Sequence, residues 1–141
     1  MQDHTPEAEA LFRAFAERHS LTIRKVKEPN VELLMELPRQ PGLSFDLTLG
    51  LQNADELSIG FEGFWSYIFP FNQKHELVSS LLDGIVSGAC RLAVHRQFGL
   101  VVKRVLERRV GDNWEPIYQA LGFGVPFIGT QVAYLSNNQS P

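Results

Sequence analysis

The feature that constrains the fold most is a strict alternation of apolar and polar residues over positions 43–52. The large apolar residues at every second position are Leu43, Phe45, Leu47, Leu49 and Leu51. Successive side chains of a β-strand point to opposite faces, so a period of two predicts a strand with one buried and one solvated face. Such a strand is typical of an antiparallel sheet that is covered on one side only.

Several neighbouring segments also have the composition of strands. Turn residues at positions 28–30, 39–42 and 53–55 separate them. The strands expected before position 72 are residues 21–27, 31–37, 43–52, 57–61 and 64–71. Because the connections between them are tight, we expect these strands to form an antiparallel meander.

Two segments have the period of an amphipathic helix, residues 5–19 and residues 73 to about 89. Strand patterns return after the second helix. They lie at residues 91–98, 100–110 and 114–121, and residues 127–135 are a candidate edge strand. The order of elements predicts an α+β fold, in which two helices pack on one face of an antiparallel sheet of about six to eight strands.

The length and composition indicate one globular domain. With 141 residues, 44% of them hydrophobic and 21% charged, we expect a single domain over residues 1–141 with a frayed tail at 136–141. The single cysteine, Cys90, has no partner for an internal disulfide and is expected to be a buried thiol in a reducing compartment. The N-terminus lacks the pattern of a secretory signal, and no apolar run is long enough for a membrane span. The expected location is therefore the cytoplasm, without a membrane association.

The sequence contains no motif that indicates catalysis or a cofactor. The four histidines are scattered, and neither HExxH nor CxxC occurs, so we expect no metal site. Nucleophile elbows and phosphate-binding glycine loops are also missing. His75 beside Glu76 could act as a general acid or base in a pocket. We favour the simpler interpretation that both are exposed residues at the start of a helix, and we expect neither catalytic residues nor a cofactor.

The charge distribution argues against a nucleic-acid partner. The formal net charge is −3, although basic residues gather in the second half. In a strand, Arg104 and Arg108 share one face whereas Lys103 and Arg109 share the other. A nucleic-acid groove requires basic residues on a single side together with stacking aromatics. We therefore interpret these residues as solvated charge that protects a sheet edge.

The segment GFWSYIFPF, residues 63–71, concentrates large rings on one face. If it is extended, that face carries Trp65, Tyr67, Phe69 and Phe71. The second helix has a stripe of small residues, Ser80, Gly84, Ser87 and Gly88. The favoured interpretation is that the rings pack in the core against this stripe. The alternative is that Trp65 and Tyr67 line a pocket or a partner-facing patch.

Two classes of function fit these observations. The first is a non-catalytic protein-interaction module, such as a secretion-type chaperone or a neutralising partner, that binds a protein partner or itself as a homodimer. The second is a small-molecule-binding or enzymatic domain with a pocket between helices and sheet. Its candidate ligand-binding residues are Trp65, Tyr67, Phe69 and His75.

Overall fold

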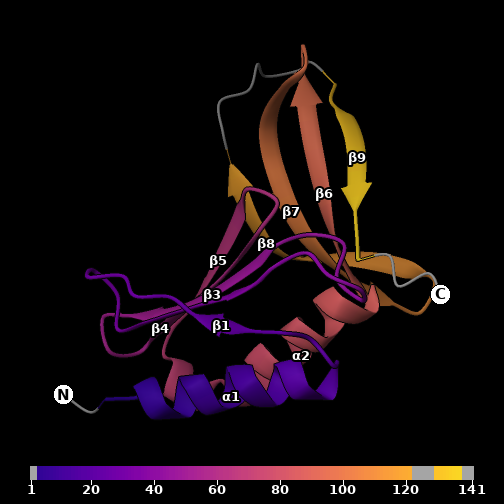
Figure 1. The fold of residues 1–141 in the computed structure, drawn as a ribbon. Coiled ribbons are helices and arrows are strands. Elements are labelled where there is room, and N and C mark those ends of the chain that lie inside the picture. Colours follow the sequence, from indigo (N-terminus) through magenta and orange to yellow (C-terminus); the bar gives the residue numbers. More distant parts are fainter. Residues whose placement is uncertain (1–2, 122–128, 138–141) are drawn as a thin grey trace.

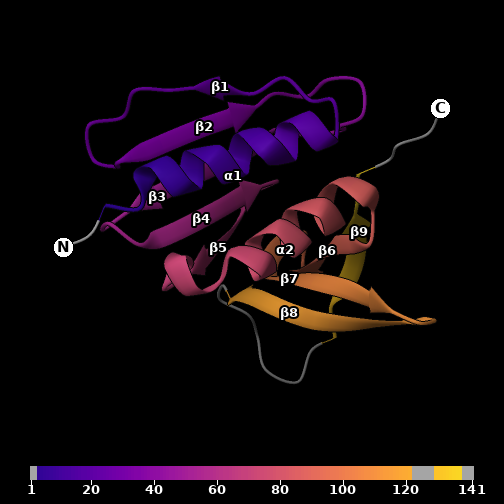
Figure 2. The same cartoon turned by 90° about the horizontal axis from the view of Figure 1, so that it is seen from below.

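The chain folds into antiparallel sheets with two helices on one side of them, which confirms the α+β class (Figure 1). The computed structural model describes residues 3–121 and 129–137. Helix α1 spans Thr5–Arg18 and helix α2 spans His75–Ser87, close to the two amphipathic segments of the sequence. Figure 2, seen from below, shows both helices in front of the strands.

The first sheet is a meander of five strands in chain order. Its strands are β1 (Arg24–Lys25), β2 (Leu33–Leu37), β3 (Leu47–Gln52), β4 (Glu56–Phe61) and β5 (Phe64–Ile68). Each strand pairs antiparallel with the next. The alternating segment 43–52 is a strand only from Leu47. The preceding Leu43 and Phe45 lie in a loop, and their side chains are buried. A short 3-10 helix, η1 (Phe71–Gln73), leads from β5 to α2.

The second sheet has four strands and begins after α2. Its strands are β6 (Cys90–Gln97), β7 (Leu100–Val110), β8 (Asn113–Leu121) and β9 (Gln131–Leu135). Their order across the sheet is β8-β7-β6-β9. The candidate edge strand at 127–135 is therefore found over residues 131–135, and positions 127 and 128 lie outside the described residues. Because α2 separates β5 from β6 along the chain, β6 begins a new ladder rather than extending the first sheet.

One hydrophobic cluster includes residues of both helices and both sheets. From α1 it includes Ala8, Phe12, Phe15 and Ala16, which recur at helical spacing. From α2 it includes Val78, Leu81, Leu82, Ile85 and Val86. Full burial of a Leu, Ile or Phe side chain stabilises a fold by roughly 1.5–3 kcal/mol. The cluster is thus the main source of cohesion between the helices and the sheets.

The small residues of α2 face the second sheet, not the aromatic segment. Gly84 packs on the start of β6, where a Cβ on this glycine would lie 2.5 Å from Sγ of Cys90. Ser80 Oγ accepts a hydrogen bond from Arg108 of β7 at 3.1 Å. Our expectation that this stripe receives the rings of residues 63–71 is therefore wrong. The close approach that the small residues allow is made by β6.

The end of the described chain is held in the core. Asn137 is only 5% exposed, and its amide group donates to the carbonyl oxygens of Gly42 and Val86, each at 2.7 Å. Its Oδ1 accepts hydrogen bonds from the backbone N–H and the hydroxyl of Ser44, at 2.7 and 3.0 Å. The expectation of fraying from residue 136 is therefore wrong for Asn137, because its partners lie far away in sequence. Positions 138–141 lie outside the described residues.

Candidate interaction site

Three aromatic side chains on and just after β5 point to solvent. Their exposed fractions are 44% for Trp65, 53% for Tyr67 and 63% for Phe69. We call these three residues the aromatic row. The alternate residues Phe64 and Ile68 are buried, as is Phe71, which lies in η1. The predicted alternation is present, but the interpretation that placed the rings in the core is wrong for all three residues of the row.

The turn between β4 and β5 decides which face of β5 is buried. Glu62 and Gly63 have φ angles of 52° and 78°, and positive values at both positions are what a type I′ hairpin turn requires. This turn pairs Phe61 with Phe64, so Phe64 joins the buried face of β4. Since register in a hairpin is set by its turn, every second residue after Phe64 is buried and the aromatic row is directed outward.

Small residues of β4 lie beside the aromatic row. Trp65 pairs with Gly60, and Tyr67 pairs with Ser58. Three atoms of the indole ring lie 2.6–2.7 Å from the position that a Cβ on Gly60 would occupy. The indole therefore covers the backbone of β4 at this glycine, a packing that supports a glycine within a sheet. The rest of the ring stays accessible to solvent.

Rings on the outer face of the second sheet are in a different state, because a cation lies between them. The guanidinium carbon of Arg91 is 4.1 Å from the ring centroid of Trp114 and 3.7 Å from that of Tyr134. Arg91 Nε also donates to Glu107 Oε1 at 2.7 Å. Within residues 3–121 and 129–137, no cation lies over the rings of the aromatic row. The rings of the aromatic row are thus exposed without a cation from the described part of the chain, whereas Trp114 and Tyr134 enclose Arg91.

His75, the fourth candidate ligand residue, lies apart from the aromatic row. Its ring stacks on Phe71, with centroids 4.4 Å apart and an interplanar angle of 18°. Its Nε2 is 3.4 Å from Glu7 Oε2, whereas its sequence neighbour Glu76 is exposed. The structure brings together Trp65, Tyr67 and Phe69 but not His75. The row lies on the face of β5 that is turned away from the buried cluster, so it does not line a space between helices and sheet.

Glu7 lies between two histidines that are distant from each other in sequence. Its Oε1 is 3.4 Å from Nδ1 of His4, and its other oxygen faces His75. His4 is buried, with Nε2 4.0 Å from Oδ1 of Asp55, and that oxygen accepts a hydrogen bond from the backbone of Asn72 at 2.9 Å. This cluster ties the start of α1 to the β3–β4 turn and η1. Sequence reasoning missed it because its members come from separate segments and have no short-range spacing.

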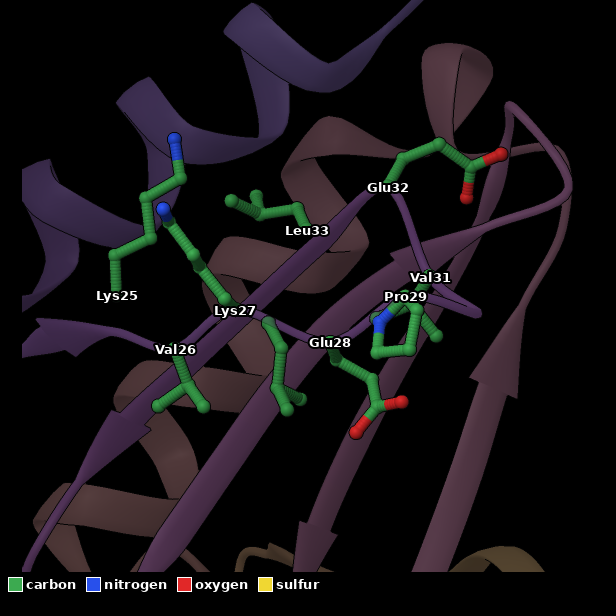
Figure 3. Close-up of a pocket in the computed structure, with 9 residues that line it drawn as sticks. Lys25, Val26, Lys27, Glu28, Pro29, Val31, Glu32 and Leu33 are labelled. Atoms are coloured by element: carbon green, nitrogen blue, oxygen red, sulfur yellow. The ribbon is translucent and has the colours of Figure 1, made fainter.

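A surface cavity of about 370 Å³ lies at the turn between β1 and β2 (Figure 3). The side chains of Lys25 and Lys27 point toward α1, whereas the carboxylate of Glu28 points away from them. Lys25 Nζ already donates to Glu9 Oε1 at 2.9 Å. Small-molecule sites usually have a few polar groups that converge on the ligand. The charges of this cavity are directed apart, so we do not assign a function to it.

The described residues offer few groups for catalysis. No set of three or more His, Cys, Asp or Glu among them could hold a metal ion. The free thiol of Cys90 is buried, and this burial raises its pKa despite the opposing effect of Arg108. A raised pKa keeps the thiol protonated and weakly nucleophilic. In residues 3–121 and 129–137 there is also no helix with the length and apolar character needed to cross a bilayer.

The basic residues of β7 are divided between the two faces of the second sheet. Arg108 contacts Ser80 of α2, and the guanidinium of Arg104 packs on Gly63 at the β4–β5 turn. Lys103 pairs with His95 and lies on the outer face together with Arg91. The absence of a nucleic-acid partner stays a prediction.

Comparisons with protein-family models, curated proteins and solved structures found no match to this chain. Among the described residues, the aromatic row brings three exposed rings together beside the β4–β5 hairpin turn.

Proposed function

We propose that the chain is a non-catalytic protein-interaction module that binds a partner protein through the aromatic row. The observation that carries the proposal is the exposure of three large rings at every second position from Trp65 to Phe69. Aromatic residues are enriched at the centres of protein interfaces and often provide most of the binding energy. An exposed apolar patch of this kind on a folded protein commonly marks an interaction site.

The shape of the surface suits an extended partner segment. Alternate residues of a strand lie about 6.5–7 Å apart, so the three rings form a row of roughly 13–14 Å. The indole of Trp65 covers Gly60 of β4, whereas Tyr67 has only the small side chain of Ser58 beside it on that strand. A partner side chain can therefore contact the ring of Tyr67 from the side as well as from above. Such access favours tight packing at the centre of an interface.

The acidic balance of the first half of the chain favours a partner that carries basic as well as apolar residues. Within the described residues, Glu56 accepts hydrogen bonds from the amides of Gln52 and Asn53, at 3.2 and 3.3 Å, and forms no ion pair. Residues 1–71 contain six Lys or Arg and eleven Asp or Glu, a difference of −5. Lys74 and Arg104 lie near the two ends of the row. We expect a partner arginine to pack on Trp65 or Tyr67 as Arg91 packs on Trp114 and Tyr134.

A chaperone-like or neutralising role is the form of this function that we propose, because both roles need a specific surface and no chemistry. The free thiol of Cys90 suits a reducing compartment such as the cytoplasm. In either role the aromatic row would be covered by the partner for most of the time. That explains how a cytoplasmic protein tolerates three exposed rings.

The test is affinity capture with the tagged full chain from the cells that produce it. Three versions are compared: wild type, Trp65→Ser/Tyr67→Ser/Phe69→Ser, and the control Phe98→Ser/Leu100→Ser. The control removes one exposed ring and one exposed aliphatic side chain at the β6–β7 turn. Phe98 is 80% exposed and Leu100 is 71% exposed. We expect one protein to copurify in stoichiometric amount with wild type and with the control. Calorimetry with the purified partner should show that it binds the row variant at least about 100-fold more weakly than wild type.

Two results would contradict the proposal. One is a stoichiometric partner that the row variant binds as tightly as wild type. The other is the lack of any partner together with a thermal shift by a small molecule that Trp65→Phe abolishes. The second result would support the ligand-binding alternative instead.

A further inference from the structure

Within residues 3–121 and 129–137, the second sheet ends in an edge strand that lacks the usual protection against pairing with another strand. The sequence of β9, QVAYL, contains no charge and no proline. Its ladder with β6 runs regularly over five residue pairs, without a bulge. All five residues of β9 are exposed. Natural proteins normally protect such an edge with charged residues, proline, bulges or a covering element.

The other sheet edges do show such features. The opposite edge, β8, contains Glu115 and Pro116, and its ladder with β7 is irregular between Leu106 and Glu107. In the first sheet, β1 has only two residues, and both are basic. The other edge of that sheet, β5, contacts β8 (Figure 1). Among the described strands, β5 and β9 are the edges that are both regular and uncharged, and of these two only β5 is contacted by a strand of the other sheet.

The chain holds β9 in a fixed position. Tyr134 stacks on the guanidinium of Arg91, which Glu107 binds from the neighbouring strand. Just after the strand, Asn137 is anchored by its buried hydrogen bonds. A binding element that is ordered before association loses less conformational entropy when it binds. The edge of β9 is therefore prepared for pairing.

We infer that β9 pairs antiparallel with β9 of a second copy of this chain, across a two-fold axis at Ala133. Pairing about this residue uses all five positions, with Val132 opposite Tyr134 and Gln131 opposite Leu135 of the second copy. A β-branched residue opposite an aromatic ring is a favourable cross-strand pair. Because β9 is uncharged, no like charges on the strand meet, and the same patch serves both subunits as a two-fold axis requires.

The dimer would join two four-stranded sheets into one continuous sheet. It would also carry one aromatic row on each subunit. The inference depends on β9 alone and needs no partner protein, so it can fail or succeed independently of the proposed function.

The test uses opposite charges at Ala133. Ala133 is exposed and meets its own copy at the two-fold axis, so Ala133→Lys and Ala133→Glu each place like charges together. An equal mixture of the two variants places opposite charges together. The control is Phe98→Lys, which adds the same charge at the 80% exposed tip of the β6–β7 hairpin. The mass of each sample is measured by sedimentation equilibrium over a wide range of concentrations.

We expect a wild-type dimer, a dissociation constant raised about tenfold or more in each Ala133 variant, and a heterodimer in the mixture. Phe98→Lys should dimerise like wild type. A monomeric wild type, a full dimer in both Ala133 variants, or a mixture that does not associate would overturn the inference.

Hydrogen exchange in the wild-type protein gives a second test that needs no variant. Backbone amides of β9 should exchange more slowly as the protein concentration increases through the dimerisation range. Exchange that does not depend on concentration would overturn the inference even if the variants failed to fold.

Discussion

The two sheets present aromatic rings to solvent in two different states. On the second sheet, Trp114 and Tyr134 enclose the guanidinium of Arg91, and the rings fasten strands to one another. On the first sheet, the aromatic row has no cation over it within the described residues. The same residue types thus stabilise the fold where the chain supplies their partner, and remain available for another molecule where it does not.

The largest expected effect separates the two faces of β5. Phe64→Ala should lower the free energy of unfolding by about 3–5 kcal/mol, because it leaves a cavity at a side chain that is 1% exposed. The matched variant Phe69→Ala, at a ring that is 63% exposed, should cost less than about 1 kcal/mol. Urea denaturation of both variants measures the difference. Similar losses would mean that the row is packed in the core after all.

The second effect on stability concerns Asn137, which holds the chain just after β9, the strand that carries Tyr134. Asn137→Ala removes four hydrogen bonds, two with Ser44 and one each with the carbonyl oxygens of Gly42 and Val86, from a side chain that is itself buried. We expect a loss of about 2–3 kcal/mol in thermal or urea unfolding. Asn113→Ala, at an exposed position, is the control and should change stability little. An unchanged stability of Asn137→Ala would show that the chain end is not held as described.

A smaller effect tests the cation itself. Arg91→Ala should cost about 1–2 kcal/mol, since it removes contacts with two rings and the ion pair with Glu107. In a Trp65→Phe background it should also change the fluorescence of Trp114. Lys103→Ala, on the same face, is the control and should leave that fluorescence unchanged. If Arg91→Ala has as little effect as the control, Arg91 does not pack between Trp114 and Tyr134. The aromatic rings of the two sheets would then be in the same state.

The smallest expected effect on stability concerns Asp83 of α2, which contacts Arg18 and His19 at the end of α1. Burial alone would raise the pKa of Asp83, but hydrogen bonds from His19 at 2.7 Å and Arg18 at 2.9 Å outweigh it and lower this pKa. The resulting stability is present above about pH 4 and is lost as the pH falls through the lowered pKa. Asp83→Asn should therefore cost under about 1 kcal/mol at pH 7, because the site is partly exposed. This difference should disappear once the pH has fallen below the lowered pKa of Asp83; a difference that grows on acidification would contradict the assignment.

Periodicity in the sequence predicted the helices, most strands and the α+β class, because these depend on local spacing. It could not decide which face of β5 is buried, since alternation defines two faces without ranking them. The turn at Glu62 and Gly63 and the pairing of Phe61 with Phe64 make that choice. The contacts of Arg91 and Asn137 were also beyond prediction, because their partners lie up to 95 positions away in sequence. The exposed row itself was foreseen only as the alternative to a buried one.

The most direct test of the central claim is the accessibility of Trp65 in the Trp114→Phe protein, where it is the sole tryptophan. Iodide and acrylamide quenching should be efficient in the free protein and should fall sharply when the captured partner is added. Weak quenching in the free protein would place the ring in the core. Quenching that the bound partner leaves unchanged would show that the aromatic row is not its binding surface.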